Sequence, residues 1–219
     1  MAPSIVVSYD GTPDDDDAIG LGRLFADCGA SVALAYVRHS RLEDPAAEER
    51  ETRAAAALLE RGAAKFGGET QTYVLFNPST AAALVELIER EGFDVIVFGS
   101  SYRTPAGHVA PGRASQQLID GGPAAVGLAP AGYRDQAPKL EKVGLVTAAP
   151  GDAAEQTAKS FGVDVVPAPA PADLLVIASR PGVAKGRASI PAASEQLAEE
   201  AAACPVLVVA NETPLDFSS

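Results

Sequence analysis

Cysteine is scarce in this sequence and long hydrophobic runs are missing, and each absence excludes a class of protein. The 219 residues include two cysteines, Cys28 and Cys204, which lie in apolar, alanine-rich segments without the spacing of metal ligands. We expect both to be buried thiols of a reducing compartment. No apolar run reaches the roughly 18 residues that a membrane helix requires, and no basic leader precedes the first apolar residues. The sequence therefore predicts a cytoplasmic protein with no membrane partner.

The motifs of common catalytic and phosphate-binding loops are absent too. The chain has no Walker A motif, no Gly-x-Gly-x-x-Gly, no Gly-x-Ser-x-Gly and no pair of metal ligands. Its two histidines, His39 and His108, have no cysteine or serine placed to form a triad. Slow ATP hydrolysis would have Asp10 as its only candidate base. We therefore predict a binding protein and not an enzyme.

Basic residues are outnumbered by acidic ones. Seventeen Lys and Arg against 29 Asp and Glu give a formal net charge of -12 at pH 7. A field of this sign repels nucleic acid and anionic membranes, so neither is expected as a partner. The composition, 47% hydrophobic and 21% charged, is that of a folded globular protein.

Short apolar runs alternate with longer amphipathic segments in the N-terminal part of the chain. This alternation is typical of a parallel sheet covered by helices on both faces. Thr12 with Pro13, and Ser79, are expected to begin two of the helices, and glycines to end three of them. We predict an α/β fold with an open, parallel, five-stranded, Rossmann-like sheet. The expected strands are 5–8, 31–37, 71–76, 94–99 and 125–129, the expected helices are 14–28, 44–65, 79–91 and 113–119, and the helix-ending glycines are Gly29, Gly67 and Gly92.

The rest of the chain is a shortened copy of this pattern. Asp94-Val-Ile-Val-Phe-Gly-Ser100 matches Asp173-Leu-Leu-Val-Ile-Ala-Ser179, and fifteen residues after each of these serines lies another, within Ala-Ser-x-Gln-Leu. Equal spacing of two such segments indicates an internal repeat. We predict two domains, residues 1–135 and 138–219. In the second, the proline-rich stretch 167–171 replaces a helix–strand–helix, and the sequence leaves open how it crosses the sheet. The expected strands are 142–147, 163–166, 173–178 and 206–210, and the expected helices are 152–161 and 193–203.

The candidate binding site lies at the carboxyl ends of the first-copy strands, where open α/β sheets bind their ligands. Asp10 follows the first strand, Val37 ends the second, and the glycine-containing loop 99–112 leaves the fourth and opens the next helix. Glycines there let the backbone approach a ligand closely, and free amides at a helix start favour an anion.

This arrangement resembles a tandem universal stress protein. Nucleotide-binding members of that family carry a glycine, two residues, a glycine, nine residues, a glycine and then Ser or Thr. Here these positions hold Gly99, Tyr102, Gly112 and Arg113. The outer glycines match, whereas Tyr102 replaces the second glycine and Arg113 replaces the hydroxyl residue.

The resemblance implies a stress-response protein with an adenine nucleotide, such as AMP or ATP, in the first copy. Asp10 would touch adenine or ribose, the Val37 backbone would read the adenine edge, and the loop 99–112 would hold phosphates. Whether Mg²⁺ takes part is left open. Because Tyr102 adds bulk where backbone must approach phosphate, we expect a ligand with less phosphate than ATP, or none. The expected binding residues are Asp10, Val37, Gly99, Tyr102, Arg103, Gly112, Arg113 and Ala114.

Each of these features also has a purely structural explanation. Asp10 can cap a turn, and Gly99 and Gly112 can be turn glycines. The run Asp14 to Asp17 is expected to be a solvated first helical turn that complements the helix dipole. The basic residues of loop 99–112 equally suit a solvated loop. The alternative function is a ligand-free relative that acts through dimerisation or protein–protein contact.

The second copy is not expected to bind nucleotide. Ala178, Pro181 and Pro191 stand where the first copy has its family-motif residues, and no counterpart of Asp10 follows the strand 142–147. The two prolines also remove amides that a phosphate-binding loop would offer.

The last strands of the two copies, 125–129 and 206–210, are expected to associate. Both are apolar and terminal in their sheets, and a bare sheet edge invites pairing. In the family this strand commonly makes the dimer contact, so one chain would contain an internal pseudo-dimer. Whether two chains then form a homodimer is left open.

Overall fold

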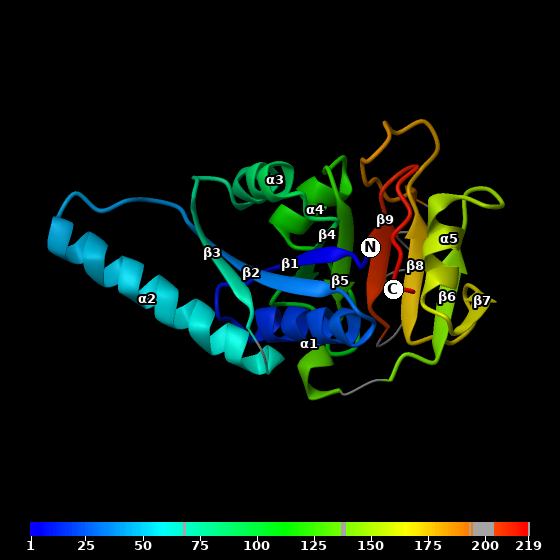
Figure 1. The fold of residues 1–219 in the computed structure, drawn as a ribbon, viewed down its shortest axis with the longest axis horizontal. Helices are drawn as coiled ribbons and strands as arrows, with labels where there is room; N and C mark the ends of the chain where they lie inside the picture. The colour runs from blue at the N-terminus through cyan, green and yellow to red at the C-terminus, as the bar shows by residue number, and fades with distance from the viewer. Residues whose placement is uncertain (68, 137–138, 193, 195–203, 219) are drawn as a thin grey trace.

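The computed structural model describes residues 1–67, 69–136, 139–192, 194 and 204–218, which form a nine-stranded sheet with helices on both faces (Figure 1). The strand order is β3-β2-β1-β4-β5-β9-β8-β6-β7. The predicted α/β class is confirmed, and the two copies share one continuous sheet.

The first unit has β1 Ser4–Ser8, α1 Pro13–Asp27, β2 Ser31–Arg38, α2 Pro45–Ala63, η1 Ala64–Phe66, β3 Gln71–Phe76, α3 Thr80–Glu91, β4 Val95–Gly99, α4 Arg113–Ile119 and β5 Ala125–Ala129. The 3-10 turn η2 Tyr133–Asp135 leads to the second unit, β6 Lys142–Val146, α5 Ala153–Ser160, β7 Asp164–Pro167, β8 Leu174–Ala178 and β9 Val206–Val209.

Alternate strand residues enter two hydrophobic cores, one on each face of the sheet. Val7 of β1 packs in the core that α1 covers, to which α2 contributes Leu59. Its neighbour Val6 packs on the other face with Leu84 of α3 and Leu118 of α4. Because successive side chains of a strand point to opposite faces, strands covered on both sides must be apolar throughout. This explains the uninterrupted apolar runs of β1, β4 and β5, and it leaves the strand ends as the place for polar chemistry.

Two buried serines show that the second unit repeats the first in detail. Ser100 Oγ donates to Ala129 O at 2.7 Å and accepts from Ala110 N at 3.2 Å. Ser179 makes the equivalent bonds, to Val209 O at 2.7 Å and from Ser189 N at 3.0 Å. Each serine ties the loop that follows its own strand to the end of the neighbouring strand. The internal repeat therefore extends to individual hydrogen bonds.

The proline-rich stretch crosses the sheet at a glycine. β7 and β8 pair in parallel with opposite edges of β6, so the chain must return over β6 between Pro167 and Leu174. Its path passes Gly144 of β6, where an added Cβ would lie 3.2 Å from the Ala172 side chain. Because Gly144 has no side chain, this short stretch can pass directly over β6, without a helix between the two strands that it connects. This is how the stretch 167–171 connects β7 to β8 across the sheet, which the sequence leaves open.

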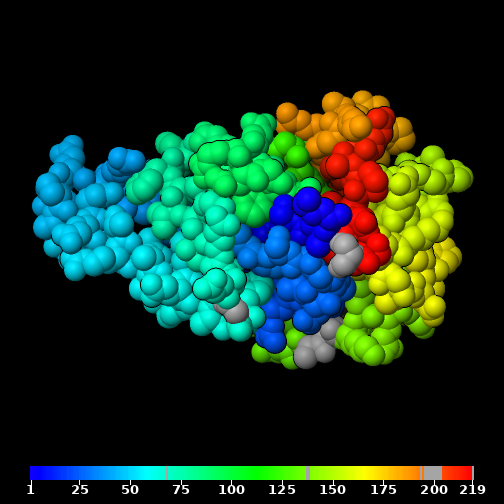
Figure 2. Space-filling model, in the orientation of Figure 1, coloured from blue at the N-terminus to red at the C-terminus, as the bar shows by residue number. Residues whose placement is uncertain are grey.

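The last strands of the two units pair as predicted. β5 and β9 are antiparallel, with Val126 opposite Val208 and Gly127 opposite Leu207. On the α1 face, the Phe217 ring stacks on Phe161 at 4.2 Å between centroids and lies 5.6 Å from Phe25 of α1. The two units are thus joined by a strand pair and an aromatic cluster, and Figure 2 shows them as one body from which the first half of α2 projects.

Most predicted helix ends are confirmed. The Ser79 side chain accepts from Ala82 N, and Gly92 ends α3 in the left-handed region at φ 77. Thr12 stands at the start of α1 as predicted, but its side chain makes no capping hydrogen bond. The helix predicted over 193–203 lies outside the described residues.

The two cysteines differ in their surroundings. Cys204 is buried, as expected, and burial raises its pKa to about 12. The expectation of burial is wrong for Cys28, which is only half-buried at the end of α1, although its partial burial still raises its pKa. Among the described residues, no helix combines the length and apolarity needed to cross a membrane, and no three potential metal ligands cluster.

Candidate functional site

Asp10 lies just beyond β1, and its carboxyl group is bound locally. Asp10 Oδ1 accepts from Thr12 N at 3.1 Å, and Asp10 N donates to Asp15 Oδ2 at 2.5 Å. The hydrogen bond from the Asp15 carboxyl lowers the pKa of Asp10. Burial and the hydrogen bond between the two carboxyl groups raise the pKa of Asp15 to about 8, although the bond from the Asp10 amide acts in the opposite direction. The two carboxyl groups therefore share one proton at neutral pH, and Asp10 carries the negative charge.

The acidic run at the start of α1 is not the solvated turn that its sequence predicts. Asp17 is buried, with 1% exposure, and its carboxylate accepts from Gly132 N at 2.9 Å and from Arg134 N at 2.8 Å. The Arg134 guanidinium also contacts it at 3.1 Å. Asp16 forms an ion pair with Lys65. The run therefore anchors the connector between the units to α1, instead of only complementing the helix dipole.

Gly99 is required by the packing of α1 on β4. An added Cβ would lie 1.8 Å from Asp14 O in the first turn of α1, far inside van der Waals contact. Gly112 is different, because the nearest atom to an added Cβ would be Ser115 Oγ at 4.0 Å. The first motif glycine is thus explained without a ligand, whereas no packing contact explains the last.

The loop between β4 and α4 is held by its own hydrogen bonds. Ser100 fixes its start and Ser101 N donates to Ala110 O at 2.8 Å. Tyr102 is 73% exposed, and the Arg103 guanidinium lies 5.1 Å from its ring centroid. The tyrosine that replaces the second motif glycine therefore stands on the outside of the loop.

Two adjoining pockets open at the carboxyl ends of β2 and β3. One, of about 240 Å³, is lined by Arg113, Ala114, Ser79, Gln117 and His39 among others. The second, of about 190 Å³, shares His39 and Pro78 with the first and extends to Arg38, Arg41 and Phe76. We call the two together the His39 groove. No acidic residue lines either part.

The charges of the His39 groove are mostly uncompensated. Glu48 neutralises Arg38 through an ion pair at 2.8 Å. Arg41 contacts the Phe76 ring at 4.5 Å, and His39 Nδ1 lies 3.2 Å from Asn77 O. Among the described residues, Arg113 has no hydrogen bond or ion pair. In a chain of net charge -12, the groove is a local concentration of positive charge.

The structure brings only part of the predicted set together. Arg113 and Ala114 line the His39 groove, and the backbone of the buried Val37 pairs with Leu75 two residues before His39. Asp10 and Gly99 lie instead at the first turn of α1 and do not line the groove. His39 and Arg41 are not among the predicted binding residues, although their position directly after the second strand could have indicated them.

Comparison with known proteins decides the family. The model of the universal stress protein family matches residues 1–130, well over half of the chain. The chain belongs to this family. No curated protein matches the sequence.

Solved structures agree with this universal stress protein in fold. A universal stress protein from Archaeoglobus fulgidus DSM 4304 superposes with a TM-score of 0.57 and 12% identity, covering 94% of this chain and 98% of that one. A functionally unknown protein from Pseudomonas aeruginosa PAO1 gives 0.59 and 15%, covering 97% and 94%. A universal stress protein in complex with cAMP covers 44% of this chain and 71% of that one, with 19% identity and a TM-score of 0.34. At these identities the first two structures show the likeness in fold alone, and none of the three says anything of the ligand.

In the second unit of this universal stress protein, an aspartate occupies the amides that an anion would use. The Asp152 carboxylate accepts from Ala148 N at 2.8 Å, Ala149 N at 3.2 Å and Glu155 N at 2.9 Å. Burial raises the pKa of Asp152, but these bonds and one from Thr147 Oγ1 outweigh it and hold the pKa below its usual value. The adjoining cavity of about 160 Å³ is lined largely by small apolar side chains.

Proposed function

We propose that this universal stress protein binds an adenine nucleotide of the monophosphate class in its first unit and acts by binding and not by turnover. The observation that carries the proposal is the His39 groove. It is a basic, acid-free hollow at the carboxyl edge of the sheet of a strongly acidic protein. Ligands of open α/β sheets bind at this edge. Because the chain belongs to the universal stress protein family, such binding would act in regulation under stress.

The groove suits one phosphate better than three. Its two parts measure about 240 and 190 Å³, so the whole groove lies near the lower end of the roughly 300–1,000 Å³ of typical small-molecule sites. The Arg113 guanidinium can bind a phosphate in a bidentate manner, which replaces the bond that the family's hydroxyl residue would make.

The nucleoside would be bound by predicted residues that do not line the groove. The Val37 backbone lies two residues before His39, in β2, and would read the adenine edge. Asp10 uses one oxygen for Thr12 N, and a carboxylate has further lone pairs for a ribose hydroxyl. Arg103 and Tyr102, on the exposed loop, would close over the ligand from outside.

A second candidate is a ligand-free relative that acts through protein contact. It is favoured by the contact between Gly99 and Asp14 O, which explains the motif glycine by packing alone. The self-contained hydrogen bonds of the loop 100–112 favour it as well.

A thermal-shift series separates the two candidates. Adenosine, AMP, ADP and ATP are compared with and without Mg²⁺, on the native chain and on Arg113→Gln, Asp10→Ala and the exposed control Arg50→Gln. We expect AMP to give the largest shift, equivalent to about 2.7 kcal/mol at 100 times its dissociation constant. Arg113→Gln should reduce that shift and Arg50→Gln should not. No shift with any nucleotide would favour the ligand-free relative, and an ATP–Mg²⁺ shift indifferent to both site variants would show the site to be wrong.

A further inference from the structure

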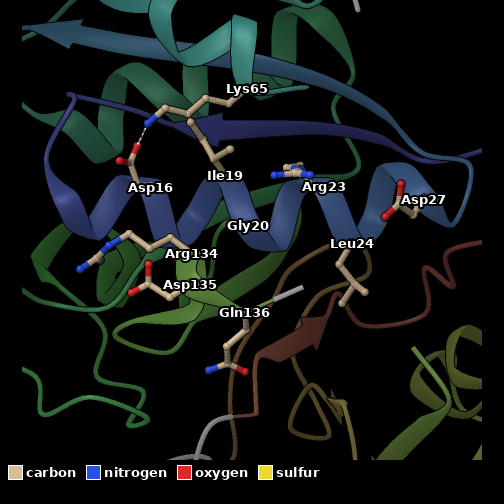
Figure 3. A pocket seen from close by; sticks show the side chains of 10 residues that line it. All are labelled: Asp16, Ile19, Gly20, Arg23, Leu24, Asp27, Lys65, Arg134, Asp135 and Gln136. Atoms are coloured by element: carbon tan, nitrogen blue, oxygen red, sulfur yellow. Dashed lines mark hydrogen bonds and ion pairs between the residues drawn. The ribbon is translucent and has the colours of Figure 1, made fainter. Parts of the chain in front are cut away.

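A second pocket, remote from the His39 groove, lies on the outer face of α1. It measures about 450 Å³, within the range of small-molecule sites. Figure 3 shows α1 as its floor, Lys65 of η1 on one wall and Arg134, Asp135 and Gln136 of the connector on the other. None of its lining residues belongs to the predicted nucleotide site. The family resemblance assigns it no role.

The floor of this α1 pocket is apolar and well packed. Ile19 and Leu24 are 3% and 4% exposed. Between them Gly20 lets the connector approach α1, because an added Cβ there would lie 3.1 Å from the Tyr133 ring. The pocket therefore has a fixed depth, and its base is closed by aliphatic side chains that expose little of their own surface.

The charges around the rim are balanced in number but not all paired. Lys65 is paired with Asp16, and Arg134 with Asp17. Arg23 and Asp27 lie one helical turn apart on α1, a spacing that often gives an ion pair, yet neither has an ion pair or hydrogen bond among the described residues. An unpaired guanidinium and an unpaired carboxylate thus lie one helical turn apart along the α1 side of the pocket (Figure 3).

We propose that the α1 pocket binds a small zwitterion with an aliphatic side chain, of the class of α-amino acids and dipeptides. The ligand carboxylate would bind the Arg23 guanidinium and its ammonium group would bind Asp27. Its side chain would lie at the base of the pocket, against the small exposed part of Ile19 and Leu24 and the methylene chain of Lys65. A polyanion would meet the carboxylates of Asp16, Asp27 and Asp135, and a polycation would meet three basic side chains. A ligand with one charge of each sign avoids both repulsions.

Such a ligand would also hold the connector between the units. It would contact α1 and residues 134–136 together, next to the bonds that Asp17 makes to Gly132 N and Arg134 N. Binding should therefore slow hydrogen exchange of the connector amides. The nucleotide proposal plays no part in this inference.

The test is an NMR titration of the full chain with L-leucine and L-leucyl-L-leucine. N-acetyl-L-leucine lacks the ammonium group, and L-leucinamide lacks the carboxylate, so each removes one of the two proposed contacts. The variants are Arg23→Gln and Asp27→Asn, with Arg50→Gln as a matched surface control. We expect the two zwitterions to shift amide resonances of residues 19–27 and 132–136 saturably. Arg23→Gln should weaken that binding by about tenfold or more, since a charge-assisted bond is lost.

The outcomes are distinct. Binding of the zwitterions that is weakened by Arg23→Gln and Asp27→Asn, but not by Arg50→Gln, supports the proposal. Equal binding of either capped derivative overturns the zwitterion as the ligand class. Titrations that leave the α1 resonances unmoved, or that are indifferent to both variants, overturn the site.

Discussion

At the scale of single residues, the surroundings of the aspartates at the start of α1 differ from those that the local sequence predicts. Four consecutive aspartates read as a solvated turn, yet Asp17 is buried under a connector 115 residues further along and Asp15 shares a proton with Asp10. Burial of a carboxylate is tolerated only where donors meet it, and those donors come from distant chain. No local pattern could therefore have predicted it.

The shared proton makes stability depend on pH. The pKa of Asp15 is raised from 3.8 to about 8 in the folded chain, so the folded state binds a proton that the unfolded state has released. The free energy of unfolding should therefore fall as pH rises from about 4 to about 8. Asp15→Asn mimics the protonated group and should remove most of this slope, as measured by urea unfolding at several pH values. The exposed control Glu69→Gln should keep it, and a slope unchanged in Asp15→Asn would contradict the shared proton.

At the scale of elements, strands and helices follow from the sequence more closely than their contacts do. The predicted helix 113–119 is α4, and the predicted strands 71–76 and 125–129 are β3 and β5, because apolar period and glycine position are local signals. The crossing over Gly144 is not local, since it depends on which strand lies beneath the chain. The His39 groove likewise exists only because parallel register brings the ends of β2 and β3 beside the start of α4.

The two motif glycines, Gly99 and Gly112, should differ in how much the stability of the fold depends on them. Gly99→Ala would drive a Cβ to 1.8 Å from Asp14 O, so α1 must move off β4, and we expect a loss of about 1–3 kcal/mol or more in stability. Gly112→Ala meets nothing closer than 4.0 Å at an ordinary φ of -76, and its stability should change by less than about 0.5 kcal/mol. Chemical denaturation of both variants gives the comparison. Equal losses would mean that the close contact of α1 with Gly99 is not what fixes that position.

At the scale of the whole molecule, the second unit completes the sheet of the first. β9 covers the edge of β5, which is buried along its whole length and carries no charge. Phe161 and Phe217 cover Phe25 on the α1 face. The amides that follow β6 in the second unit donate to its own Asp152, so what the structure shows of this unit is its structural role.

Removing the second unit should therefore replace the pairing of β5 with β9 by pairing of β5 with the same strand of another fragment. A chain of residues 1–135 keeps Gly132 and Arg134 for Asp17 but exposes the β5 edge and Phe25, and each large apolar side chain fully exposed costs about 1.5–3 kcal/mol. An uncharged, exposed edge strand is a template for pairing, so we expect this fragment to self-associate through β5. Light scattering over a range of concentrations would show a mass of at least twice the fragment, with the full chain measured alongside as reference. A fragment that remains monomeric, and as resistant to urea as the full chain, would show that the first unit has no need of its partner strand.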